Sequence, residues 1–209
     1  LTATATQTVT VTDTENPTIT APANVTVNSD AGSCDATGVA LGSAITADNC
    51  GIASTINDAP AVFPLGATTV TWTVTDNAGL TATATQTVTV TDTENPTITA
   101  PANVTVNSDA GSCDATGVAL GSAITADNCG IASVSNDASE PFALGTTTVT
   151  WTVTDDAGLT ATATQTVTVT DTENPTITAP VNITVNSDAG SCDATGVALG
   201  SPVTADNCG

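Results

Sequence analysis

The sequence predicts an all-β chain of tandem β-sandwich domains, and three of its features lead to this prediction. The segment that begins DTENPTITAP at Asp13 returns at Asp92 and at Asp171, 79 residues further on each time, so the chain is an internal repeat. Apolar and polar residues alternate with a period of two, as in strands that bury one face. No segment carries the period of an amphipathic helix.

The repeats divide the chain into four parts. Residues 1–12 match 80–91 and are expected to form the last strand of a preceding repeat. Residues 13–91 and 92–170 are near copies, each predicted to be a complete sandwich domain, and 171–209 are the N-terminal part of a further repeat. The chain is therefore expected to be a window on a longer array.

Short strands are expected through the first half of each repeat. In the first repeat they lie at 18–20 and 24–28, which Ala21-Pro22 separates, then at 35–41, 52–57 and around Phe63, with a polar loop over 42–51. A light core of Val, Ala, Ile and Leu, with one Trp and one Phe per repeat, indicates a small domain that needs a disulfide or a metal for stability.

The clearest prediction is a β-hairpin at the end of each repeat. Every second residue of 69–76 is Thr, and Val70, Trp72 and Val74 lie between them. The run 80–91 alternates in the same way, and Asp76-Asn77-Ala78-Gly79 supplies a turn between the two. The apolar face belongs in a core and the Thr face outside. Several short strands with turns at this spacing predict an immunoglobulin-like sandwich.

The charge of the chain excludes several classes of function. It has 21 carboxylates and no Lys, Arg or His. Without cations it cannot neutralise nucleic-acid phosphates or bind an anionic membrane by charge, and no apolar run is long enough to span a bilayer. Catalysis is not expected either, because there is no His, Lys or Tyr to transfer protons. The chain is predicted not to be an enzyme.

The six cysteines form three equivalent pairs with fixed spacing: Cys34 with Cys50, Cys113 with Cys129, and Cys192 with Cys208. An even count at fixed spacing favours disulfides in an oxidising compartment over free thiols or a zinc site. Bonds within each pair are expected. The alternative is a bond from Cys34 to Cys129 of the next repeat, because a strand between Cys34 and Cys50 would hold them too far apart.

The repeat resembles the hyalin repeat (HYR) domain. The matching motifs are DTENPTI at the start of the repeat, ADNCG at 47–51, PLG at 64–66 and VTWTVTDNAGL at 70–80. The resemblance covers the whole chain and implies an immunoglobulin-like module of extracellular proteins, found also in long bacterial arrays, with an adhesive or structural role.

Acidic loops predict a calcium site at one end of each sandwich. In an immunoglobulin-like fold the entry of the first strand, the B–C loop and the F–G loop lie together, and here all three are acidic. Calcium takes six to eight hard oxygen ligands, whereas magnesium prefers fewer protein ligands. The alternative is that these are ordinary turn residues. The expected ligands are Asp13, Glu15, Asn16, Asp48 and Asp76; Asp92, Glu94, Asn95, Asp127 and Asp155; and Asp171, Glu173, Asn174 and Asp206.

These features together predict a secreted or cell-surface structural protein. The repeats would form a calcium-rigidified stalk, fibre or filament whose partners are copies of itself or other surface and matrix components. The alternative function is an adhesion module that binds glycan or protein ligands directly.

Overall fold

A computed structural model describes all 209 residues, and every regular element in it is a β-strand. Contacts divide the chain into two compact units. Unit 1 comprises Leu1–Thr97, Ala126–Ser133 and Thr154–Thr160, and unit 2 comprises Ile98–Thr125, Val134–Val153 and Ala161–Gly209. None of the chain forms a helix that could cross a bilayer.

The two full repeats contain equivalent sets of eight strands. The first repeat contains β1 (Thr18–Thr20), β2 (Val25–Asn28), β3 (Asp35–Thr37), β4 (Ile45–Ala47), β5 (Ile52–Asn57), β6 (Val62–Pro64), β7 (Gly66–Asp76) and β8 (Thr81–Thr91). The second contains β9 (Thr97–Thr99), β10 (Val104–Asn107), β11 (Asp114–Ala115), β12 (Ile124–Ala126), β13 (Ile131–Asn136), β14 (Phe142–Ala143), β15 (Gly145–Asp155) and β16 (Thr160–Thr170). Residues 171–209 contain β17 (Thr176–Thr178) and β18 (Val203–Ala205).

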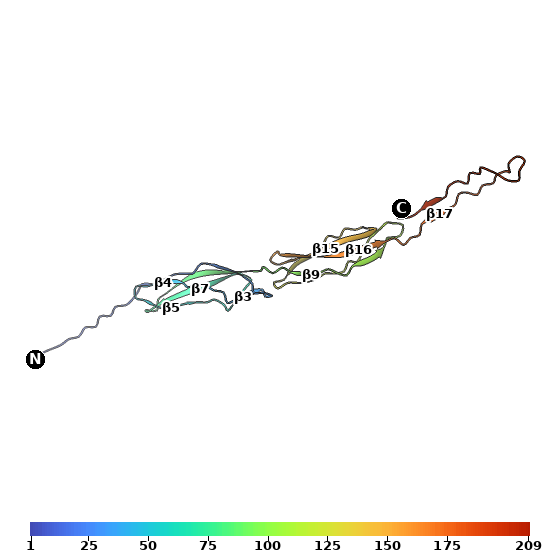
Figure 1. Cartoon of the computed structure of the whole chain (residues 1–209). Helices are drawn as coiled ribbons and strands as arrows, with labels where there is room; N and C mark the ends of the chain where they lie inside the picture. Colours follow the sequence, from blue (N-terminus) through green and yellow to red (C-terminus); the bar gives the residue numbers. More distant parts are fainter. The chain divides into compact units, whose positions relative to one another are not determined.

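Two layers of strands form the sandwich of the first repeat (Figure 1). One layer is a four-stranded sheet in the order β2-β8-β7-β5, in which β2 runs parallel to β8 and the other pairs are antiparallel. The other layer consists of the pairs β1-β4 and β3-β6. The second repeat has the same arrangement, with the sheet β10-β16-β15-β13 and the pairs β12-β9 and β11-β14.

The core of the sandwich lies between these layers. Val70, Trp72 and Val88 point inward from the large sheet and meet Ala36 and Phe63 from the smaller layer. The Thr residues between them lie on the other, more exposed face, because successive side chains of a strand point to opposite sides. The equivalent core of the second repeat is Ala115, Phe142, Val149, Trp151, Val167 and Val169.

The predicted all-β sandwich and its hairpin are confirmed, with one strand missed. β4 forms inside the stretch expected to be a polar loop. It pairs with β1, and Thr18 donates its hydroxyl hydrogen to the carbonyl oxygen of Ala47 at 3.0 Å. Ile45 of this strand is 74 % exposed. The strand is therefore held by its backbone pairing, and its side chains show no buried alternation.

The segments before and after the two full repeats form few strands. Residues 1–12 have the sequence of β8 but pair with no other strand here, so the expectation that they form the last strand of a preceding repeat stays a prediction. In 171–209 only β17 and β18 pair, antiparallel, in the register of β1 and β4. A strand needs a partner for its backbone groups, and 171–209 has no counterparts of β6 and β8.

Candidate metal centres

One aspartate of each centre ends the first strand of the long hairpin. Asp76 is the last residue of β7, and its Oδ1 accepts hydrogen bonds from the backbone N–H groups of Ala78 and Leu80, both at 2.8 Å. Asp155 ends β15, and its Oδ1 accepts from the N–H of Leu159 at 2.8 Å. Both aspartates are 1 % exposed. One oxygen therefore stabilises the turn, while the Oδ2 of each is buried without a partner.

A second aspartate precedes the cysteine of the ADNCG motif. The Oδ2 of Asp127 accepts hydrogen bonds from the N–H groups of Cys129 at 2.8 Å and Gly130 at 3.0 Å. In the first repeat the Oδ2 of Asp48 accepts from the N–H of Cys50 at 2.8 Å. These bonds again use one oxygen, and the Oδ1 of both aspartates is buried without a partner.

The third aspartate opens the repeat. The Oδ1 of Asp92 accepts from the backbone N–H of Glu94 at 3.1 Å, and Asp13 makes the same bond with Glu15 at 3.1 Å. The Oδ2 of each is buried and unpartnered. Asp92 is 8 % exposed, so it lies out of reach of most solvent.

The three aspartates of each repeat converge. Asp13, Asp48 and Asp76 form one cluster, and Asp92, Asp127 and Asp155 form the other, with one carboxylate oxygen from each residue within 4.8 Å of the others. At this distance each pair of charges repels by roughly 3.5 kcal/mol at an effective dielectric constant near 20. The chain has no Lys, Arg or His to offset that repulsion. Turn formation explains one oxygen of each aspartate. The other oxygens have no hydrogen-bond partner in the protein and are placed where a bound cation would contact them.

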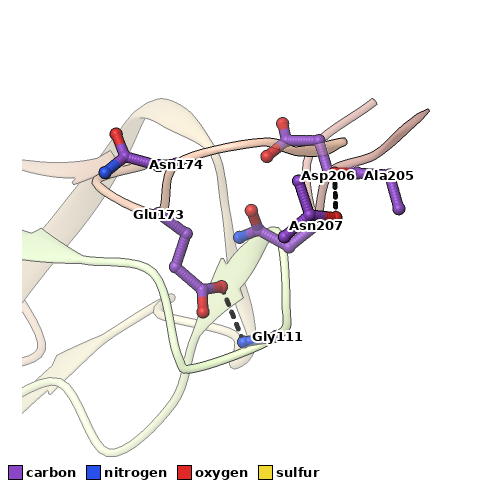
Figure 2. A pocket seen from close by; sticks show the side chains of 7 residues that line it. Gly111, Glu173, Asn174, Ala205, Asp206 and Asn207 are labelled. Carbon is purple, nitrogen blue, oxygen red and sulfur yellow. Dashed lines mark hydrogen bonds between the residues drawn. The ribbon is translucent and has the colours of Figure 1, made fainter. Parts of the chain in front are cut away.

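The structure does not place the predicted glutamates in these clusters. The Oε2 of Glu94 accepts a hydrogen bond from the N–H of Gly32 at 2.9 Å. Glu173 makes the equivalent bond with Gly111 at 2.8 Å, and Figure 2 shows its carboxylate turned toward Gly111 and away from Asp206. Asp92 and Glu94 are two residues apart, a spacing that places side chains on the same side of an extended segment. The carboxylate of Glu94 nevertheless bonds to Gly32, outside the cluster that contains Asp92.

Most of the remaining predicted ligands line hollows beside the aspartates. Asn95 lines a shallow hollow next to Asp127, and Asn174 lines the equivalent hollow next to Asp206 (Figure 2). Glu15 lines a hollow beside Asp13. Asn16 stays a predicted ligand. Asp171 and Asp206 have no third aspartate, because 171–209 contains no counterpart of Asp76.

Asn128, which is not among the expected ligands, contacts the second cluster. Its Nδ2 donates to the Oδ1 of Asp92 at 3.2 Å and to the carbonyl oxygen of Ser33 at 2.8 Å. Its own Oδ1 is buried and has no partner. The available signal was its place beside Asp127 in ADNCG, because an amide oxygen is a hard donor like a carboxylate.

The predicted pairing of the cysteines is wrong. The disulfides join Cys34 to Cys129 and Cys113 to Cys208, with Cα atoms 4.7 and 5.0 Å apart, so the alternative of a bond to the next repeat is correct. Cys50 and Cys192, expected to be bonded, are free and exposed.

Strand geometry explains why Cys34 and Cys50 do not pair. The carbonyl oxygen of Cys34 accepts from the N–H of Leu65, which precedes β7. The carbonyl oxygen of Cys50 accepts from the side chain of Asn77, which follows β7. The 11 residues of β7 therefore separate the two cysteines, by roughly 35 Å at about 3.3 Å per residue.

The free thiol of Cys50 reports the charge of the first centre. Local desolvation raises its pKa, and the neighbouring carboxylates of Asp13, Asp48 and Asp76 raise it further.

Comparison with known proteins assigns both repeats to one family. Two tandem sandwiches, each opened by an acidic cluster, define a class of modular β-repeat proteins. The HYR domain family matches residues 12–90 and 91–169, and the chain belongs to this family. No curated protein sequence matches it.

Solved structures show only a weak likeness. Protocadherin gamma B7 extracellular cadherin domains 1–4 are 12 % identical over 82 % of this chain and 55 % of that chain, with a TM-score of 0.37. Protocadherin gamma C5 EC1–3 is 13 % identical over 74 % and 68 %, with a TM-score of 0.36. The human desmocollin-1 ectodomain is 15 % identical over 81 % and 44 %, with a TM-score of 0.26. The chain thus spans about half the length of the first of these proteins.

Proposed function

We propose that this chain belongs to an extracellular structural protein in which calcium ions and disulfides join successive HYR domains into a stalk, fibre or filament. The observation that carries the proposal is the convergence of unpartnered, buried carboxylate oxygens in a chain without cations. The HYR family and the two disulfides support a location outside the cell or on its surface.

The donor set favours calcium over other ions. All the converging atoms are hard oxygens, whereas zinc sites use sulfur and nitrogen donors. Three carboxylates leave room for backbone oxygens and water in a shell of six to eight ligands, which suits calcium better than the strict octahedron of magnesium. An ion here would offset the repulsion between three charges that the fold holds together.

The residues around the second centre explain how an ion there would stiffen the connection between repeats. Asp92 opens the second repeat, while Asp127 and Asp155 belong to two of its loops. An ion bound by all three fixes the opening segment against both loops. Glu94, through Gly32, and the Cys34–Cys129 disulfide then hold this assembly to the 32–34 loop of the first repeat.

Removing one ligand at one centre tests this function. Asp92→Asn keeps an oxygen that can accept from Glu94 but removes one charge from the centre. Calcium at about 100 times its Kd would stabilise the wild-type chain by roughly 2.7 kcal/mol per ion bound only by the folded state. We expect isothermal titration calorimetry to detect binding at the two centres of the wild type and at one in the variant. The calcium-dependent rise in Tm should fall accordingly.

Asp193→Asn is the matched control, because it removes the same charge from an exposed aspartate outside both clusters. It should bind calcium like the wild type. If the wild-type chain has the same Tm in calcium and in chelator, the aspartates only stabilise turns and the proposed function is wrong.

A further inference from the structure

The two centres of this chain share their three aspartates but differ in the asparagine beside them. Asn49, next to Asp48, is exposed and makes no side-chain hydrogen bond. Asn128, next to Asp127, is partly buried, and its amide nitrogen donates to the Ser33 carbonyl of the preceding repeat. The same arrangement recurs at Asn207, whose Nδ2 donates to the carbonyl oxygen of Ser112 at 2.8 Å and whose Oδ1 is also buried and unpartnered.

The disulfide lies directly beside this amide. Ser33 precedes Cys34 and Asn128 precedes Cys129, so the Cys34–Cys129 bond holds together the two short segments that the Asn128–Ser33 hydrogen bond connects. Asn128 also donates to the Oδ1 of Asp92. With both amide hydrogens committed, the amide plane is fixed. The buried Oδ1 is left without a partner, on a side chain that already bonds to Asp92 of the cluster.

We infer that Asn128 is a further ligand of the Asp92–Asp127–Asp155 centre, and that the preceding repeat positions it through the Ser33 carbonyl and the Cys34–Cys129 disulfide. This inference rests on the proposed calcium function. The centre is therefore complete only when two repeats are in contact. Forming the disulfide raises the calcium affinity of the second centre and leaves the first unchanged.

Each centre can be titrated alone within the full chain. In an Asp13→Asn background only the second centre retains its three aspartates, and in an Asp92→Asn background only the first does. We expect Asn128→Ala in the former to weaken calcium binding by roughly tenfold or more, as is usual when a group that supports a metal site is removed. Asn49→Ala in the latter should change the Kd by much less. Equal losses at the two centres would overturn the inference.

Asn128→Asp separates a ligand from a purely structural residue. Aspartate keeps an oxygen for the ion but cannot donate to Ser33 or Asp92. If Asn128 acts as a ligand, Asn128→Asp should recover much of the calcium affinity that Asn128→Ala loses. If Asn128→Asp binds as weakly as Asn128→Ala, the side chain acts only through its hydrogen bonds, and the assignment as a ligand is wrong.

The paired variant Cys34→Ser/Cys129→Ser tests the positioning by the preceding repeat. It should weaken calcium binding at the second centre by about fivefold or more, the lower range of measured couplings between sites. Adding Asn128→Ala to it should cost less than Asn128→Ala alone. Unchanged affinity in the disulfide-free variant would refute the coupling. Absence of calcium binding by the wild-type chain would instead refute the proposed function.

Discussion

A buried glutamine connects the two layers of each sandwich. Gln86 is fully buried on the inner face of β8, and its Oε1 accepts from the indole N–H of Trp72 at 3.1 Å. Its Nε2 donates to the carbonyl oxygens of Ala23 at 2.7 Å and Leu41 at 2.9 Å. Gln165 repeats these contacts in the second repeat. Every strong hydrogen-bonding group of the side chain is used, so the amide stabilises the core despite its polarity.

Replacing this amide with a carboxylate should destabilise the domain strongly. In Gln86→Glu the ionised side chain would face the carbonyl oxygens of Ala23 and Leu41 with nothing to donate. We expect a loss of about 3–5 kcal/mol in the free energy of unfolding at neutral pH, the cost of an uncompensated buried charge. Chemical denaturation measures it.

The loss should shrink as the pH falls. Burial would raise the pKa of the new carboxyl group in the folded state above its unfolded value, so the folded state takes up the proton first and the penalty is relieved in acid. Gln7→Glu is the matched control, because Gln7 has the same place in the repeat sequence but is exposed. Equal effects of the two substitutions would show that the buried network is unimportant.

At the scale of elements, the 127–130 loop contains a proposed metal ligand, a disulfide and a turn within four residues. Gly130 has φ +116°, a conformation that side chains rarely adopt, and its N–H donates to the Oδ2 of Asp127. A Cβ at this position would lie 2.6 Å from the Oδ2 of Asp156. The glycine therefore allows Asp127 to keep its other oxygen directed at the centre.

Gly130→Ala should weaken both the fold and calcium binding. The strained backbone costs about 1–3 kcal/mol, and relief of that strain would shift the N–H that orients Asp127. Thermal denaturation with and without calcium measures both effects. Gly117→Ala is the control, because Gly117 has φ +64° and open space around it. It should lower stability slightly and leave the calcium-dependent part of the Tm unchanged.

Local patterns predict the elements of this chain well where one face is buried. Alternation identifies β7 and β8 because their Val and Trp side chains enter the core while their Thr side chains do not. It fails for β4, which is held by backbone pairing and exposes Ile45. In the same way the placement of the aspartates in three loops predicts that they converge, but it does not predict the direction of Glu94, which depends on a contact with Gly32.

The disulfides could not be predicted from the spacing of cysteines within a repeat, because each bond joins cysteines of two successive repeats. Cys34 and Cys50 are 16 residues apart in sequence but lie at opposite ends of β7, whereas Cys34 and Cys129 are 95 residues apart and bonded. Only the contact between the 32–34 loop and the next ADNCG loop identifies the partner.

At the scale of the whole molecule, charge and cross-links act together. The chain carries a formal charge of −21, and the two clusters of three aspartates contain its most buried carboxylates. The other carboxylates are on the surface, where repulsion between them opposes compaction and favours solubility. Each disulfide closes a loop of about 95 residues, and such a loop stabilises the folded state by on the order of 4–5 kcal/mol.

The two closed loops overlap in sequence, since the first runs from Cys34 to Cys129 and the second from Cys113 to Cys208. Every peptide bond between Cys34 and Cys208 is consequently bypassed by at least one sulfur bridge, and a protease that cuts the backbone anywhere in that span does not release a fragment. A protease site inserted at the exposed Pro60, between β5 and β6, should give a nicked chain that migrates as one species on a non-reducing gel and as two after reduction. The same site inserted at Thr12, before the first bridge, should release its short fragment without a reductant. A protein with this pattern of cross-links can be damaged at many points along its backbone and still hold together end to end.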